Sequence, residues 1–170
     1  MNKYYQNNKL KILLIGSNGQ LGHDFQKLFK NLNIEHIAAD YEELNIANDT
    51  DIEIFFKKNN NFTHIINCAA YNDVDQAEKD IEKCIKINKD APLIIAKYAK
   101  KMNAIFVTYS SDFVFDGKKK NPFLEEDIVS PLSIYGKSKS SMEKDVMEEY
   151  SKSFIIRTSW LFGKNGENFN

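Results

Sequence analysis

The chain is poor in the residues that mark several special classes of protein. It has two cysteines, three prolines, seven glycines and one tryptophan among 170 residues. Cys68 and Cys84 are too far apart for a C-x-x-C motif, so we expect both to be reduced, with Cys68 in the core. His23, His36 and His64 are scattered and form no H-E-x-x-H cluster, so no protein metal site is expected.

Charge of one sign and long hydrophobic runs are also lacking. The net charge is −1, which excludes a strong electrostatic footprint for nucleic acid or for an anionic membrane. No hydrophobic stretch approaches the ~20 residues that a membrane span needs, and the opening MNKYYQNNK lacks the apolar segment of a secretory signal. We therefore expect a cytoplasmic protein without nucleic-acid or membrane partners. The 42% of hydrophobic residues can fill the core of one domain.

A glycine-rich segment near the N-terminus is the first feature that points to a ligand. Residues 9–22 read KLKILLIGSNGQLG, an apolar run followed by three glycines at G-x-x-G-x-x-G spacing and then by a helical pattern. Glycines allow the backbone to turn sharply and approach a pyrophosphate, which a helix N-terminus holds. A second strand at 35–39 ends at Asp40, where a carboxylate can accept hydrogen bonds from a ribose. The pattern predicts nucleotide binding; the alternative is a glycine-punctuated turn that binds nothing.

Strand and helix patterns alternate along the rest of the chain, which predicts an α/β fold with a Rossmann-like, doubly wound parallel sheet and helices on both faces. The ligands of such a sheet lie at the carboxyl ends of its strands. No internal repeat or low-complexity tract is present. Further strands are expected at 63–68, 104–109 and 154–157, and helices at 51–60, 75–102 (interrupted near 90–92) and 132–150.

Tyr135 and Lys139 lie four residues apart in the last of these helices. Residues at i and i+4 share one face of a helix, with an axial rise of about 6 Å. A nearby ammonium favours the phenolate and lowers the pKa of a tyrosine, so we expect Tyr135 to be able to pass a proton to a substrate oxygen. The alternative is that both side chains are solvated cover on an amphipathic helix.

Six ordered blocks resemble the extended short-chain dehydrogenase/reductases, and most closely the dTDP-4-dehydrorhamnose reductases. The blocks are GSNGQLG, Asp40, NCAAYNDVDQAE (67–78), SSDFVFDG (110–117), SPLSIYGKSK (130–139) and RTSWLFGKNGENF (157–169), which together cover almost the whole chain. The resemblance implies NAD(P)H-dependent reduction of the C4 ketone of dTDP-4-dehydro-6-deoxy-L-mannose to dTDP-L-rhamnose, a precursor of surface polysaccharide. The partner would be a dTDP-linked 4-keto-6-deoxy sugar.

The same resemblance implies a role for individual residues. Ser111, at a position that is usually threonine, would hydrogen-bond the substrate carbonyl; Tyr135 would protonate the alkoxide, and Lys139 would hold the nicotinamide ribose. Asp112 and Trp160 would join Ser111 in contacting the substrate, although a loop cap and core packing are the alternative roles of these two. The implied cofactor-binding residues are Gly16, Gly19, Gln20, Leu21, Gly22, Asp40, Asn45 (usually aspartate), Ile46, Ala69, Ala70, Tyr71, Tyr109, Tyr135 and Lys139.

Cofactor choice stays open between NADH and NADPH. A carboxylate at Asp40 favours a free ribose 2′-hydroxyl and repels a 2′-phosphate, and the glycine loop has no arginine to offset it. These residues favour NADH. The resemblance, however, includes enzymes that use NADPH or both.

Reductases of this family have a second lobe of on the order of a hundred residues, a common small-domain size. We therefore expect residues 1–170 to be the NAD(P)-binding Rossmann domain of a longer reductase, a truncated form with the C-terminal substrate lobe absent. Turnover would then be impaired, and uncovered apolar sheet surface would favour a homodimer. Two alternatives remain: a sugar-nucleotide epimerase or dehydratase, and a non-catalytic subunit resembling the regulatory subunit of methionine adenosyltransferase. Phe113 after Asp112 argues against a dehydratase, which would have an acidic pair there.

Overall fold

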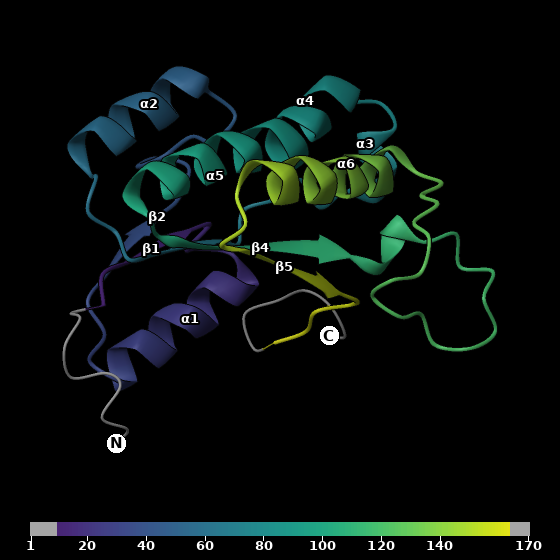
Figure 1. Ribbon diagram of the computed structural model, residues 1–170, viewed down its shortest axis with the longest axis horizontal. Coiled ribbons are helices and arrows are strands. Elements are labelled where there is room, and N and C mark those ends of the chain that lie inside the picture. Colours follow the sequence, from purple (N-terminus) through teal and green to yellow (C-terminus); the bar gives the residue numbers. More distant parts are fainter. Residues whose placement is uncertain (1–9, 164–170) are drawn as a thin grey trace.

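Five parallel strands form one sheet with the order β2-β1-β3-β4-β5 (Figure 1). The computed structural model describes residues 10–163. The sequence-based prediction of a Rossmann-like parallel sheet is therefore confirmed, and the four strands whose bounds were predicted lie within two residues of those bounds. The strands are β1 Ile12–Ile15, β2 His36–Ala39, β3 His64–Asn67, β4 Ile105–Ser111 and β5 Ser153–Thr158.

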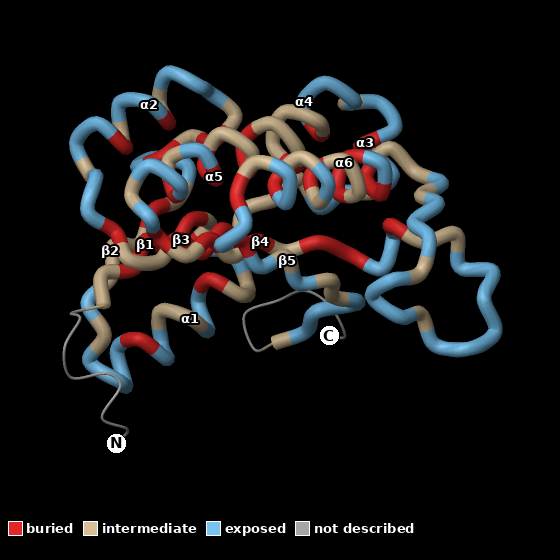
Figure 2. Tube along the Cα trace, in the orientation of Figure 1, coloured by how far each residue is buried: buried red, intermediate tan, exposed pale blue. Residues whose placement is uncertain are grey.

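Helices cover both faces of the sheet, but unequally (Figure 1). On one face, α1 packs Phe29 against Ile12, Leu14 and Ile66 in a small core. On the other face, α2, α5 and α6 bury a larger core against strand residues such as Leu13. The buried positions of Figure 2 accordingly concentrate in the strands and on the inner sides of these helices. The helices are α1 Gln20–Asn31, α2 Asp49–Lys58, α3 Val74–Ala77, α4 Ile81–Ile85, α5 Ala91–Met102 and α6 Ile134–Glu149.

The 75–102 segment is less regular than its sequence pattern predicts. An additional break separates α3 from α4, and residues Lys86–Asp90 form a π-helix that leads into α5. At the predicted interruption near 90–92 the helix therefore does not end. It widens into a π-helical turn and continues as α5. Pro92 is the physical reason, because it has no N–H to donate to the carbonyl of Asn88 four residues earlier.

One part of the α1 face has little cover. Phe154 and Ile156 on edge strand β5 are paired in register with Val107 and Tyr109, which belong to the α1-side core. Phe154 and Ile156 are nevertheless 59% and 42% exposed. Helix α1 covers this face around β1 and β3 (Figure 1), so among the described residues it leaves the part of the face beside β5 exposed.

The strand order also fixes where a ligand can enter. The chain runs outward from β1 to β2 on one side and from β3 to β4 and β5 on the other. In such sheets the crevice lies at the carboxyl ends of the two strands where the order reverses, here β1 and β3. None of the helices in residues 10–163 is long and apolar enough to cross a membrane.

Candidate active site

The glycine turn after β1 lies at this crevice, and its shape requires two of its glycines. Gly16 has a φ of +74°, and a Cβ there would lie 2.5 Å from the backbone nitrogen of Ala69. A Cβ on Gly22 would lie 2.3 Å from the carbonyl oxygen of Gly16. The first glycine therefore lets the turn touch the end of β3, and the third lets α1 start close against the turn.

The N-terminus of α1 is open to an anion. Its N-cap residue is Gly19, which offers no side-chain hydrogen bond to the first amides of the helix. Gln20 and Leu21 form the start of the helix, beside this turn. Unpaired amides and the helix dipole together favour a negatively charged group at such a position. The geometry therefore fits the diphosphate of a dinucleotide.

A crevice of about 330 Å³ opens next to the turn. Asp40 lies at its rim, where its two carboxylate oxygens accept hydrogen bonds of 2.8 Å from the backbone amides of Asn18 and Tyr41. Asn45 accepts a hydrogen bond from the amide of Ala47 at 3.0 Å, which shapes the loop after β2. The crevice is lined by Ile15, Gly16, Asp40, Tyr41, Leu44, Asn45, Ile46, Ala47, Ala69, Ala70, Lys83 and Ile87.

Ser111 and Tyr135 meet at the carboxyl end of β4. Ser133 caps α6 by accepting a hydrogen bond from the amide of Gly136 at 3.0 Å, which places Tyr135 in the first turn. Tyr135 is 9% exposed. Burial raises its pKa, whereas a hydrogen bond with the Ser111 side chain lowers it and the charge of Asp112 raises it. The structure thus brings together the two hydroxyls expected to act on a substrate oxygen.

Lys139 lies beneath Tyr135 but does not shift its pKa as predicted. Its ammonium is 5.8 Å from the centroid of the Tyr135 ring and donates a hydrogen bond of 3.1 Å to the carbonyl oxygen of Tyr109. Burial lowers the pKa of Lys139 to about 8. The expectation of a lowered pKa for Tyr135 is therefore wrong for this structure, because burial, the largest cause, raises that pKa.

The two predicted substrate-contacting residues differ in their settings. Asp112 accepts hydrogen bonds from the hydroxyls of Ser111 at 3.1 Å and Ser159 at 2.7 Å, so it links β4 to the segment that follows β5. Trp160 has a left-handed φ of +47° and is 67% exposed. Core packing of Trp160, the alternative considered from the sequence, is thereby excluded.

The side chains of Tyr71 and Tyr109, two of the predicted cofactor residues, are engaged away from the crevice. Other predicted residues that do not line it are Gly19, Gln20, Leu21, Gly22, Tyr135 and Lys139. Tyr71 donates its hydroxyl to Asp80 at 2.9 Å. The Tyr109 side chain packs against the core on the α1 face, and its burial raises its pKa to about 12. Tyr109 nevertheless reaches the site through its backbone carbonyl, which holds Lys139.

Asn88 is a site residue that sequence reasoning missed. It is fully buried in the π-helix. Its side chain accepts from the amide of Tyr71 at 2.8 Å and donates to the carbonyl of Tyr71 at 3.0 Å and to the hydroxyl of Ser138 at 3.2 Å. Asn88 thereby ties the loop after β3 to α6. The segment before Pro92 reads IEKCIKINKDAP, in which nothing local distinguishes Asn88 as a buried residue.

Glu78 is a second residue of this kind. Its carboxylate accepts a hydrogen bond of 2.7 Å from the amide of Ile134, the first residue of α6. The segment after α3 therefore holds the start of the helix that carries Tyr135.

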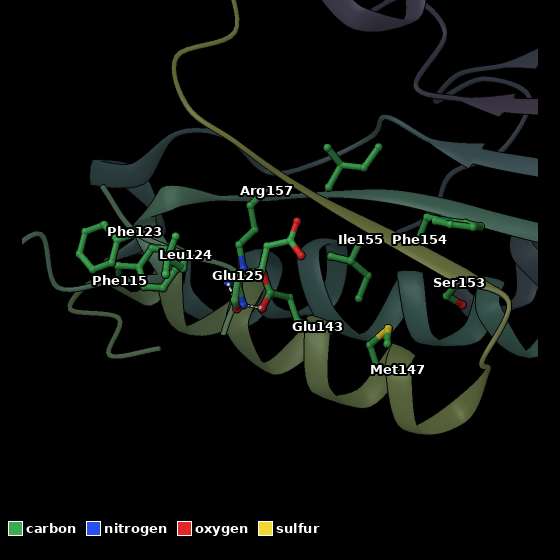
Figure 3. Close-up of a pocket in the computed structure, with 11 residues that line it drawn as sticks. Phe115, Phe123, Leu124, Glu125, Glu143, Met147, Ser153, Phe154, Ile155 and Arg157 are labelled. Atoms are coloured by element: carbon green, nitrogen blue, oxygen red, sulfur yellow. Dashed lines mark hydrogen bonds and ion pairs between the residues drawn. The ribbon is translucent and has the colours of Figure 1, made fainter. Parts of the chain in front are cut away.

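A larger cavity, of about 650 Å³, lies along edge strand β5 and away from these hydroxyls (Figure 3). In Figure 3 the Arg157 guanidinium points toward Glu143 of α6, to which it donates at 2.8 and 2.7 Å. Arg157 also lies over the ring of Phe115, 5.0 Å from its centroid. These contacts hold the loop after β4 to the sheet. We assign nucleotide binding to the smaller crevice, because the glycine turn, Asp40 and the open N-terminus of α1 are there.

Comparison with known proteins identifies similar chains. The family described as the RmlD substrate binding domain matches residues 10–170. A dTDP-4-dehydrorhamnose reductase of Aggregatibacter actinomycetemcomitans is 40% identical over 163 residues, which are 94% of this chain and 54% of that protein. The chain thus spans about half the length of the curated relatives it matches.

The solved structures that match this chain include reductases with the same name. A crystal structure of a dTDP-4-dehydrorhamnose reductase from Clostridium acetobutylicum matches with a TM-score of 0.89 and 41% identity, over 94% of this chain and 56% of that one. A dTDP-4-dehydrorhamnose reductase from Bacillus anthracis, in complex with NADP, matches with a TM-score of 0.89 and 35% identity, over 95% of this chain and 57% of that one.

Proposed function

Because the chain belongs to the RmlD substrate binding domain family, we propose that it is the dinucleotide-binding domain of an NAD(P)H-dependent reductase. The reaction is reduction of the C4 ketone of dTDP-4-dehydro-6-deoxy-L-mannose to dTDP-L-rhamnose. The observation that carries this proposal is the joint presence of the crevice beside the glycine turn and the buried Ser111, Tyr135 and Lys139. The names of the relatives support the substrate.

Each end of the dinucleotide has residues suited to it. The open amides at the start of α1 would hold the diphosphate, and the crevice between Asp40 and Ala69–Ala70 would hold the adenosine. Lys139 holds the nicotinamide ribose. When bound, the reduced nicotinamide supplies a hydride. The chain's own residues then have to orient the ketone and provide a proton.

Tyr135 provides that proton. Reduction adds a hydride to C4 and leaves a negative charge on its oxygen, so the phenol O–H bond breaks and a new O–H bond forms on the sugar. Ser111 donates a hydrogen bond to the same oxygen and stabilises the charge as it develops. A raised pKa keeps Tyr135 protonated before the hydride arrives, which suits an acid.

Two measurements test this function. Fluorescence titration with NADH and NADPH tests binding, and loss of nicotinamide absorbance with the dTDP-4-keto sugar tests reduction. We expect saturable binding of a dinucleotide and consumption of it only when the sugar nucleotide is present. Failure to bind either dinucleotide would contradict the whole proposal.

A further inference from the structure

Two charged side chains of opposite sign line the adenosine crevice. Asp40 is the carboxylate, and Lys83 is the cation among the described residues that line it. Every dinucleotide that enters brings at least the two negative charges of its diphosphate, and NADPH adds a 2′-phosphate. The placement of one cation in this crevice therefore bears directly on which dinucleotide it accepts.

Lys83 forms no ion pair within 4.0 Å among the described residues, although its charge contributes, after hydrogen bonds from Tyr71 and Gln76, to the lowered pKa of Asp80. Lys83 is exposed on α4, with its ammonium 5.8 Å from the centroid of the Tyr71 ring. By contrast, Lys86 pairs with Asp49 at 2.6 Å and Lys89 contacts Asp145 at 3.5 Å. The stem of a lysine has four flexible carbons, so its ammonium can follow a bound phosphate.

The Asp40 carboxylate is held in place by hydrogen bonds, so its negative charge stays close to a bound 2′-phosphate. Each of its carboxylate oxygens is held by a backbone amide, those of Asn18 and Tyr41. The amide of Asp40 itself donates to Glu43 at 2.9 Å, which brings a second carboxylate close to the same loop. A 2′-phosphate at this rim meets fixed negative charge and requires a cation from another element.

We propose that Lys83 is the specificity-determining residue that supplies this cation and lets the crevice accept a 2′-phosphate despite Asp40. The inference rests on the proposed function, since it assumes that a dinucleotide binds here. It assigns a role to α4, whereas the sequence pattern directs attention only to the glycine turn and the end of β2. Without Lys83 the crevice would select NADH.

The test compares Lys83→Gln with the unmodified chain in titrations with NADPH and NADH. The expected result is an NADPH dissociation constant about fivefold or more higher, with that for NADH changed less than about twofold, and a smaller NADPH effect at high salt. Lys79→Gln is the matched control. It removes the same charge, and Lys79 is also exposed but does not line the crevice. Equal losses for both dinucleotides, or none, would overturn the proposal.

Adenosine probes separate this outcome from failure of the function itself. Adenosine 2′,5′-bisphosphate and 5′-AMP compete for the crevice without needing the nicotinamide or a sugar. We expect Lys83→Gln to weaken only the bisphosphate, and Asp40→Asn to strengthen it relative to 5′-AMP. If the unmodified chain binds no dinucleotide at all, the proposed function fails; if it binds both and Lys83→Gln does not discriminate, only this inference fails.

Discussion

Tyr135 and Lys139 are 9% and 4% exposed, and their burial governs their acid–base behaviour. Each loses hydration of its charged form, so the pKa of the phenol rises and the pKa of the ammonium falls to about 8. A tyrosine that stays protonated is suited to donate. A lysine with a lowered pKa makes the site sensitive to mildly alkaline pH.

The substitution Tyr135→Phe tests the proton donor. It removes only the hydroxyl and keeps the ring that packs against Phe113, with centroids 5.7 Å apart. We expect turnover to fall by about a hundredfold or more, because a positioned general acid contributes about that much. Dinucleotide affinity should stay within a few fold, as measured by fluorescence titration. Normal turnover in this variant would show that another group supplies the proton.

The lowered pKa of Lys139 predicts a pH dependence of stability. Below about pH 8 the lysine is charged in both folded and unfolded states, and the folded state bears the full cost of burying the ammonium. Between about 8 and the ordinary value of 10.5 the unfolded state binds more protons, so this contribution to stability rises with pH.

Urea unfolding of the unmodified chain and of Lys139→Met, at several pH values across this window, measures the effect. The difference in unfolding free energy should shift in favour of the unmodified chain as pH rises. Other groups that titrate there, such as Cys68, whose pKa burial raises to about 12, are present in both proteins and cancel. A difference that does not vary with pH would contradict the lowered pKa.

At the scale of elements, the close approach of α1 to the turn after β1 depends on Gly22. Gly22→Ala would place a methyl group 2.3 Å from the carbonyl oxygen of Gly16 and 2.6 Å from that of Ser17. The backbone must shift, so we expect a stability loss of about 1–3 kcal/mol and at least about tenfold weaker dinucleotide binding. Thermal unfolding and titration measure the two effects.

Gly19→Ala is the matched control for Gly22→Ala. Its new methyl group would meet only the Gly16 carbonyl oxygen, at 3.4 Å. Stability should therefore change by less than about 1 kcal/mol. If the two variants were equally stable, close packing of α1 on the turn would not be the reason for glycine at position 22.

The π-helix is stabilised by its one buried amide side chain. Asn88→Ala leaves the backbone amide and carbonyl of Tyr71 without their side-chain partner and removes one hydrogen bond of the Ser138 hydroxyl, so we expect a loss of about 2–4 kcal/mol in unfolding free energy. Urea unfolding measures it. Asn59→Ala is the control, since within residues 10–163 the Asn59 side chain donates only to the carbonyl of Phe55 at the end of α2; its cost should stay below about 1 kcal/mol. Equal costs would contradict a clamping role.

At the scale of the whole molecule, the uncovered apolar face beside β5 predicts self-association. We expect sedimentation velocity to show concentration-dependent association, which the double substitution Phe154→Lys, Ile156→Lys should abolish, because charged side chains block sheet surfaces. Stability should change by less than about 0.5 kcal/mol, since both residues face solvent. Ile54→Lys, on the outer face of α2 and 46% exposed, is the control and should leave association unchanged.

Much of this architecture was predictable from local pattern. Alternating apolar and helical segments identified all five strands, and the glycine spacing and Asp40 located the crevice. The residues that sequence reasoning missed, Asn88, Glu78 and Lys83, act across long separations in the chain. Glu78 caps a helix that begins at Ile134, and the contact of Asn88 with Ser138 spans fifty residues. No local spacing reports such contacts.

By itself, the sequence determined which segments became strands and helices, where the glycine turn would lie, and that Tyr135 and Lys139 would share a helix face, because each of these depends on neighbours within a few residues. Only the tertiary structure decided the direction of the two pKa shifts, the clamp at Asn88, the placement of Lys83 in the crevice and the exposure of Phe154. Burial, hydrogen bonding and charge at those sites are set by elements that meet only when the sheet assembles.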